Sequence, residues 1–419
     1  MAKNNLVKNI LFLFFVQVVN YVAPFLVLPY LSRMLSVENF GLIMMIISVS
    51  NIALIITDFG FSLSGPLFVA RNKKHYKLIN NFIGTIYLIK FILVIFVWIV
   101  LSVIVIFRSG NSSLTSHLST IVWLAAIILA QSFQPIWLFQ GLEKMKNITI
   151  SIVISKLTYL LLIFSLVTSN EINSVLISLF TSNMIALLIS NYLIYTSGYK
   201  IGIPNIKMIW LEIRNSTPFF VSRAAVGIYT SASTFIVGSF AGFNQAAVYS
   251  SAEKLYQAGQ SALSPISQAL YPYLARSGDK KTLYKFISIL FIVISIVCFS
   301  CIHYSREIIT IFFGDKYNSA ADVLDIFLLS LIITFLSFNF GYPAFAAINK
   351  VKIANYTVLF GGMLQMLTIG VLVALNKISP INVATSVLFT ETVVLLLRVT
   401  LYIYWSKKKT IQREWNEKN

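Results

Sequence analysis

Long apolar segments alternate with short polar gaps from one end of the chain to the other. About 20 consecutive apolar residues cross the hydrocarbon core of a bilayer as a helix, and the pattern predicts twelve such helices. They are expected at approximately 10–31, 40–63, 79–106, 118–140, 148–168, 172–195, 215–240, 246–270, 283–303, 319–345, 353–375 and 380–404. We therefore predict an all-α polytopic membrane protein.

The composition indicates a chain that lies almost wholly in the membrane. Hydrophobic residues occupy 58% of the 419 positions and charged residues 11%, which excludes an ordinary soluble domain. No G-x-x-x-x-G-K-[ST] segment is present, so we expect no nucleotide-driven motor. The longest polar gap, about 196–214, is too short for a catalytic domain. Cys298 and Cys301 lack a second pair or a nearby histidine, so we expect inert thiols, no metal and no cofactor.

The positive charges are concentrated in every second gap. Of the 32 lysines and arginines, 22 fall in the two termini and the even-numbered gaps, five in the odd-numbered gaps and five inside predicted helices. Cytoplasmic loops carry an excess of lysine and arginine, so we predict an even number of spans with both termini in the cytoplasm. The net charge of +18 follows from this topology and requires no nucleic-acid partner.

An internal repeat appears when the sequence is shifted over itself so that Lys8-Asn9 aligns with Arg214-Asn215. The same shift aligns Leu35-Ser36 with Ala241-Gly242, and Gly141 to Lys146 with Ala347 to Lys352. We therefore predict two six-helix lobes, at 1–200 and 201–419. Six is even, so both lobes enter the membrane in the same orientation. Parallel repeats of this kind are typical of transporters with a central cavity.

Seven charged side chains lie at membrane depth in the predicted helices, where a charge must face protein or water. The bases are Lys90, Lys156, Arg223 and Lys254, and the acids are Asp58, Glu253 and Glu391. The bases outnumber the acids, which favours an external anion such as phosphate as their partner. Pairing within the bundle, as Glu253 with Arg223 or Glu391 with Lys254, is the alternative. Arg398 is expected to reach the cytoplasmic headgroups.

Uncharged polar side chains share faces of these helices. In the helix at 246–270, Glu253, Gln257, Gln260 and Ser264 form one polar stripe. The other candidates for polar contacts with a ligand are Gln17, Asn20, Tyr21, Asn51, Gln131, Gln134 and Trp137. Amides with an aromatic ring suit sugar hydroxyls and ring faces, although a seam of hydrogen bonds between helices has the same composition.

Four segments carry a more specific signal. They are the stretch from Asn20-Tyr21 to Leu28-Pro29-Tyr30-Leu31-Ser32-Arg33, Asp58-Phe59-Gly60-Phe61, Gln134-Pro135-Ile136-Trp137 continuing to Glu143, and Ala252-Glu253-Lys254. Together they resemble the polysaccharide-repeat exporters, in particular the O-antigen flippases of the Wzx type. The resemblance covers the whole chain, and its most specific motifs lie before Met145.

The resemblance implies the two-lobed, MATE-like fold of the multidrug/oligosaccharidyl-lipid/polysaccharide exporter superfamily. The implied activity is transfer of undecaprenyl-diphosphate-linked oligosaccharide across the bacterial inner membrane by alternating access. On this reading Arg223, Lys254, Lys90 and Lys156 offset the diphosphate. Asp58, Glu253 and Glu391 carry a coupling ion. Inner-membrane lipid and other polysaccharide-assembly membrane proteins are the implied partners. Twelve helices favour the O-antigen branch over lipid II flippases, which usually have 14.

Two other functions fit parts of the sequence. A cation-coupled multidrug exporter of the same fold would be expected to have an acid-dominated cavity, which the excess of bases opposes. A membrane glycan polymerase or ligase would be expected to have a large periplasmic loop, but no odd-numbered gap exceeds about 17 residues. We therefore expect a transporter rather than an enzyme.

Overall fold

The computed structural model describes residues 19–20, 22–108 and 114–418. Two of the expected polar residues, Gln17 and Tyr21, lie outside this part of the chain. Within it, α-helices and one short 3-10 helix make up all of the regular secondary structure. The predicted all-α class is confirmed.

The helices form two compact units. Unit 1 comprises Met1–Asn39 and Ile46–Gly227, and unit 2 comprises Phe40–Met45 and Ile228–Asn419. The division falls inside one long helix at Gly227, later in the chain than the lobe boundary expected at residue 200. That two lobes have six spans each stays a prediction.

Unit 1 contains the first described helix, Val22–Met34, and most of the helices of the first half. These are α2 (Val37–Asp58) apart from Phe40–Met45, α3 (Phe61–Arg71), α4 (Tyr76–Arg108), α5 (Leu114–Ser132), α6 (Ile136–Gly141), α7 (Met145–Leu166), α8 (Ile172–Thr196) and the beginning of α9 (Ile206–Ala241). Helix α8 packs against α5 and α7, and α3 packs against α6. Phe82 and Trp137 meet edge to face in the apolar core of the unit.

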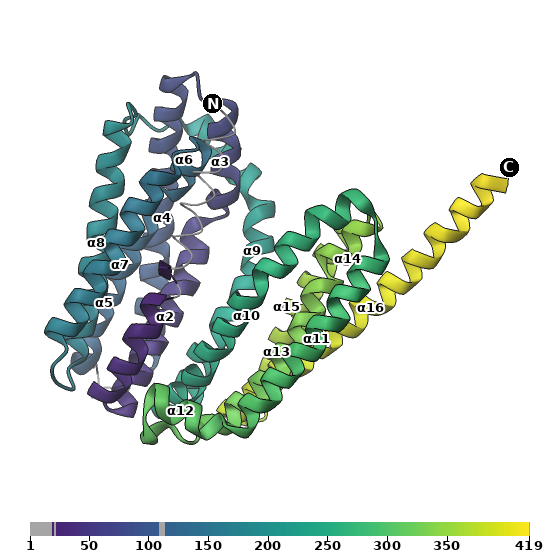
Figure 1. Cartoon of the computed structure of the whole chain (residues 1–419). Helices are drawn as coiled ribbons and strands as arrows, with labels where there is room; N and C mark the ends of the chain where they lie inside the picture. Colours follow the sequence, from purple (N-terminus) through teal and green to yellow (C-terminus); the bar gives the residue numbers. More distant parts are fainter. Residues whose placement is uncertain (1–18, 21, 109–113, 419) are drawn as a thin grey trace. The chain divides into compact units, whose positions relative to one another are not determined.

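Unit 2 is organised around one central helix. Its elements after α9 are α10 (Phe243–Ser277), α11 (Lys280–His303), α12 (Ser305–Phe313), η1 (Asp315–Tyr317), α13 (Ala320–Phe340), α14 (Tyr342–Ala347), α15 (Val351–Ala374) and α16 (Pro380–Lys418). Helix α13 packs against α10, α11 and α16. Figure 1 shows α16 continuing well past α14 toward the C-terminus. The short helix α12 was not expected from the sequence.

Nine helical segments in the described residues are long and apolar enough to cross a membrane. The expected spans at 10–31, 215–240 and 246–270 are not among them. The first is described only in part, with Val22–Met34 as a shorter apolar helix. Helices α9 and α10 have 36 and 35 residues, so they are long enough, but their polar side chains lower their hydropathy. A total of about twelve membrane-spanning helices is compatible with this fold.

Three helices that were expected to be continuous are interrupted. The first break lies between α2 and α3 at Phe59 and Gly60, both of which adopt left-handed backbone conformations with φ of 45° and 81°. The second separates α5 from α6 and ends at Pro135, whose ring cannot continue a helix. The third separates α13 from α14 at Gly341. Hydropathy is insensitive to such breaks because the apolar composition continues through them.

The shift that aligns the two halves of the sequence recurs in the backbone. It relates the first residues of four pairs of helices, which are α2 and α10, α5 and α13, α6 and α14, and α7 and α15. Glu143 and Asn349, related by the same shift, have φ of 59° and 60°. The following amide groups donate equivalent hydrogen bonds, from Lys144 N to Phe139 O (2.9 Å) and from Lys350 N to Phe345 O (2.8 Å). The internal repeat is therefore present in the backbone as well as in the sequence.

Glu212 is a buried carboxylate in α9, before the expected span that begins at residue 215. Its side chain is 2% exposed, and Oε1 has no hydrogen-bond partner among the described residues. Burial raises the pKa of Glu212 to about 6 because the charged form loses its hydration.

Glu212 is expected to make stability depend on pH. The folded state binds the proton more tightly than the unfolded state, so stability is greatest below the unfolded pKa and falls by about 2 kcal/mol as pH rises through the folded pKa. Glu212→Gln should remove this loss between about pH 4.5 and 6. Thermal unfolding of both proteins in detergent micelles across this range measures the effect. Parallel pH profiles for the two proteins would contradict it.

Candidate functional site

The break between α2 and α3 is a polar site in unit 1. Asp58 is the last residue of α2, and its Oδ2 accepts hydrogen bonds from Ser62 N (3.3 Å) and Ser62 Oγ (2.7 Å) in the first turn of α3. The carboxylate thus lies at a helix N-terminus, where the partial positive charge of the backbone stabilises it. A Cβ on Gly60 would lie 2.8 Å from Phe220 N, so this turn requires glycine.

Arg223 of α9 binds at the same break. Its Nη1 lies 3.2 Å from Asp58 Oδ2 and also donates to the Ser62 hydroxyl. The Arg223 side chain nevertheless remains 48% exposed, and that of Asp58 24%. Among the described residues, the other guanidinium nitrogens have no hydrogen-bond acceptor. A guanidinium carries five N–H donors, so Arg223 can hold Asp58 and still donate to an external anion.

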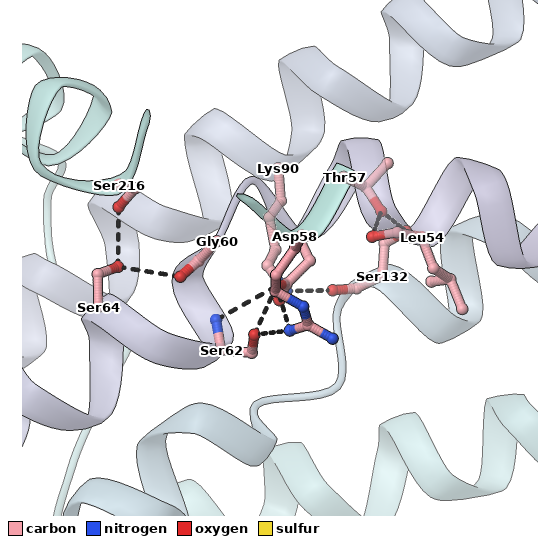
Figure 2. Close-up of polar contacts among 10 residues, drawn as sticks. Leu54, Thr57, Asp58, Gly60, Ser62, Ser64, Lys90, Ser132 and Ser216 are labelled. Carbon is pink, nitrogen blue, oxygen red and sulfur yellow. Dashed lines mark hydrogen bonds and ion pairs between the residues drawn. The ribbon is translucent and has the colours of Figure 1, made fainter. Parts of the chain in front are cut away.

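Lys90 occupies the break between α5 and α6. Its Nζ donates to Ser132 O at 2.7 Å, and Thr57 Oγ1 and Ser132 Oγ lie 2.9 Å apart. Figure 2 shows Lys90 and Asp58 converging on this region beside Ser132. Because Ser132 is the last residue of α5, Lys90 places its positive charge at a helix C-terminus. Only 4% of Lys90 is exposed, so its ammonium group lies in the protein interior rather than at an open surface.

The polar stripe of α10 belongs to unit 2. Glu253 is buried and its Oε2 accepts a hydrogen bond from Thr234 Oγ1 at 2.7 Å. Lys254 is half-buried, and its Nζ donates to Gln257 Oε1 at 3.0 Å. Gln260 is half-buried and Glu391 is buried. Lys254 therefore has a neutral amide as its hydrogen-bond partner.

Lys156 differs from the other candidate bases. It is half-buried on α7, and its ammonium group has no hydrogen-bond or ion-pair partner in the described part of the chain. A lysine at membrane depth without such a partner can take an anionic ligand.

The remaining polar candidates differ in how far their side chains are exposed. Asn51 is exposed, and Asn20, Gln131 and Gln134 are half-buried. Gln134 Nε2 contacts Asn183 Oδ1 at 3.5 Å, near the limit for a hydrogen bond. Trp137 is only 2% exposed and lies in the core of unit 1. The expectation of a sugar contact at Trp137 is therefore not supported by its surroundings.

Contrary to the expectation from the sequence, Arg398 does not reach the headgroups but lies inside the protein. It is 6% exposed and donates to Ser337 O at 2.7 Å and to Thr357 Oγ1 at 2.9 Å. Ser337 lies in the last turn of α13, so Arg398 stabilises the end of a broken helix as Lys90 does.

Ser62, Thr234 and Ser132 were not identified from the sequence alone as hydrogen-bond partners of the candidate residues. The one available signal was Gly60, which lies between Asp58 and Ser62 in the sequence.

Comparison with known proteins identifies the family. The family described as polysaccharide biosynthesis protein matches residues 6–278. The chain belongs to this family. A protein of Shigella dysenteriae named "Putative O-antigen transporter" is 31% identical over 93% of this chain and 98% of its own length. A protein of Escherichia coli (strain K12) with the same name is 26% identical over 94% and 95% of the two chains.

Solved structures show the same fold as this member of the polysaccharide biosynthesis family. A multidrug resistance MATE family transporter of the MOP superfamily, in its inward-facing conformation, superposes with a TM-score of 0.69. The match covers 94% of this chain and 99% of the other at 14% identity. The expected MATE-like, polytopic membrane fold is confirmed.

Proposed function

We propose that the chain is a flippase that moves undecaprenyl-diphosphate-linked oligosaccharide repeat units across the bacterial inner membrane. Its family membership and the transporter names of its relatives support the class of activity. The diphosphate group of the substrate is inferred from Arg223, whose side chain is ion-paired with Asp58 and yet 48% exposed at a helix break. Discontinuous helices are typical of substrate sites in transporters.

The diphosphate is bound by bases that remain available after their contacts within the protein. Arg223 offers a planar set of donors that matches phosphate oxygens, while Asp58 fixes its orientation. Lys156 in unit 1, and Lys254 in unit 2, whose ammonium group is held by Gln257 at 3.0 Å, are further bases that keep donors for phosphate oxygens. Lys90 is left out of this set because it is only 4% exposed and its ammonium group donates to Ser132 O in the interior of unit 1.

The glycan is bound by uncharged polar groups. Asn20, Asn51, Gln131, Gln134, Gln257 and Gln260 are half-buried or exposed. Their amides donate and accept hydrogen bonds, as sugar hydroxyls require. Trp137 is left out of this role because its ring is enclosed by the core.

Buried acids couple transport to an ion. Glu253 is buried and accepts a hydrogen bond from the Thr234 hydroxyl group. Burial of a carboxylate favours a bound proton or cation over an uncompensated negative charge. Glu391 is the other buried acid of this group. Asp58 is left out of it, because its side chain is 24% exposed and ion-paired with Arg223. Alternating access between the two faces of the inner membrane, with both termini in the cytoplasm, completes the proposal. The chain carries out no covalent chemistry.

Complementation tests this function. The chain is expressed in a bacterial strain that lacks its own O-antigen flippase, and surface glycan and the leaflet position of the lipid-linked unit are measured. The proposal expects surface glycan to return. Lipid-linked units that accumulate on the cytoplasmic face despite inserted protein would contradict it.

Two alternatives give different results in the same strain. A multidrug exporter would transport an organic cation, lose that transport with Asp58→Asn and leave surface glycan unchanged. A glycan polymerase or ligase would change polymer length while lipid-linked units still cross the membrane.

A further inference from the structure

A group of basic and aromatic side chains gathers at one end of unit 2. Lys350 Nζ lies 4.6 Å from the ring centroid of Trp405, and Lys280 Nζ donates to Ser406 Oγ at 2.6 Å. Three elements are involved: Lys280 begins α11, Lys350 precedes α15, and Trp405 and Ser406 lie on α16. The ammonium groups therefore lie against consecutive residues of one helix. The charge pattern of the sequence predicts that this end lies in the cytoplasm.

Neither ammonium group has a carboxylate as its described partner. Lys350 is exposed and lies over an aromatic ring, and Lys280 is half-buried beside a hydroxyl group. Asp279 is the sequence neighbour of Lys280, but its carboxylate caps α11 by accepting hydrogen bonds from Lys281 N, Thr282 N and Thr282 Oγ1. Both lysines thus keep donors for a further anionic group.

The internal repeat provides a natural comparison in unit 1. Glu143 occupies the position equivalent to Asn349, and its Oε1 forms a salt bridge with Lys73 Nζ at 2.8 Å. The backbone conformations are the same, with φ of 59° and 60°. Unit 2 thus has a neutral amide where unit 1 has a carboxylate, so the residue that directly precedes Lys350 carries no negative charge.

The end of unit 2 also has the chemistry of a membrane interface. Tyr284 and Tyr404 are exposed near this group, and the ring of Tyr404 lies 5.5 Å from that of Trp405. Tyrosine and tryptophan favour the headgroup level of a bilayer. Basic residues at this depth attract the anionic lipids of the cytoplasmic leaflet.

We propose that Lys280, Lys350 and Trp405 form a binding site for the phosphate of an anionic phospholipid in the cytoplasmic leaflet. The phosphate lies between the two ammonium groups, and the acyl chains remain in the bilayer beside α11 and α16. The site uses none of the residues proposed to bind the transported substrate, and it does not depend on that function.

Native mass spectrometry of the full-length protein in detergent tests the site. The protein is titrated with phosphatidylglycerol and, separately, with phosphatidylcholine that carries the same acyl chains. Lys280→Gln/Lys350→Gln is expected to weaken phosphatidylglycerol binding about thirtyfold, because two favourable charges are lost. Asn349→Glu, which introduces the carboxylate found in unit 1, is expected to weaken it in the same direction.

A matched variant controls for total charge. Lys74→Gln/Lys144→Gln removes two exposed lysines at the equivalent positions of unit 1 and is expected to leave phosphatidylglycerol binding within about threefold of the parent. An equal loss in both double variants would overturn the proposal, because attraction would then depend on net charge alone. Equal binding of phosphatidylcholine to the parent would also overturn it.

Discussion

Arg223→Gln is expected to reduce export of surface glycan about a hundredfold in the complementation strain. The substitution removes charge-assisted hydrogen bonds to the diphosphate, and each is worth about 1.5–3 kcal/mol. Lipid-linked units should accumulate on the cytoplasmic face. Lys254→Gln should act in the same direction with a smaller effect, because a lysine donates to phosphate as a point charge rather than a planar fork. The measurement is surface glycan per inserted molecule.

The ion pair with Asp58 makes a sharper test possible. If Arg223 only neutralises Asp58, then Asp58→Asn/Arg223→Gln should restore export because no unpaired charge remains. We expect the double variant to stay inactive, since the diphosphate has lost its ligand. Lys377→Gln, at an exposed position far along the sequence, serves as the control and should export normally. Restored export in the double variant would contradict a direct role for Arg223.

Gly84→Ala is expected to destabilise unit 1 by about 3 kcal/mol, as overpacking of a close contact does. A Cβ on Gly84 would overlap Gly202 O, and a backbone oxygen cannot move aside as a flexible side chain can. The segment after α8 is held on α4 at this point by hydrogen bonds from Gly202 N to Asn80 O (2.9 Å) and from Lys200 N to Asn80 Oδ1 (2.9 Å). The new methyl group would push this segment off α4.

Thermal unfolding in detergent measures this effect as a fall in Tm of about 6–10 °C. Gly370→Ala is the matched control, because Gly370 also lies within a helix but has no atom within 4 Å of the position of an added Cβ. Its Tm should stay the same or rise slightly, since alanine favours helix more than glycine does. Equal Tm values for the two variants would contradict the close packing of α4 on this segment.

The fold could be predicted from the sequence largely because membrane helices obey a simple rule of length and polarity. The repeat was also visible, since the turn at Leu35-Ser36 and the lysines at Lys144 and Lys350 mark helix ends that occur in both halves of the chain. The helix breaks could not be predicted in this way. Phe59 is a non-glycine residue at a φ of 45°, and its apolar side chain gives no indication of that conformation.

The candidate site was predicted in part. A charge at membrane depth identifies a residue that must face protein or water, and Asp58, Lys90 and Arg223 do converge on the breaks of unit 1. Sequence could not show that Arg223 pairs with Asp58, 165 residues away, or that Lys90 donates to a backbone carbonyl. Those partners depend on tertiary packing, and they separate a base that supports a helix end from one that can bind a ligand.

The most direct test of the proposed activity uses purified protein in proteoliposomes that contain undecaprenyl-diphosphate-linked oligosaccharide. A lectin that cannot cross the bilayer reports the glycan in the outer leaflet after the initially exposed glycan has been removed enzymatically. The proposal predicts that glycan reappears outside with the parent protein and does so about a hundredfold more slowly with Arg223→Gln. No reappearance with correctly inserted parent protein under an imposed ion gradient would contradict it.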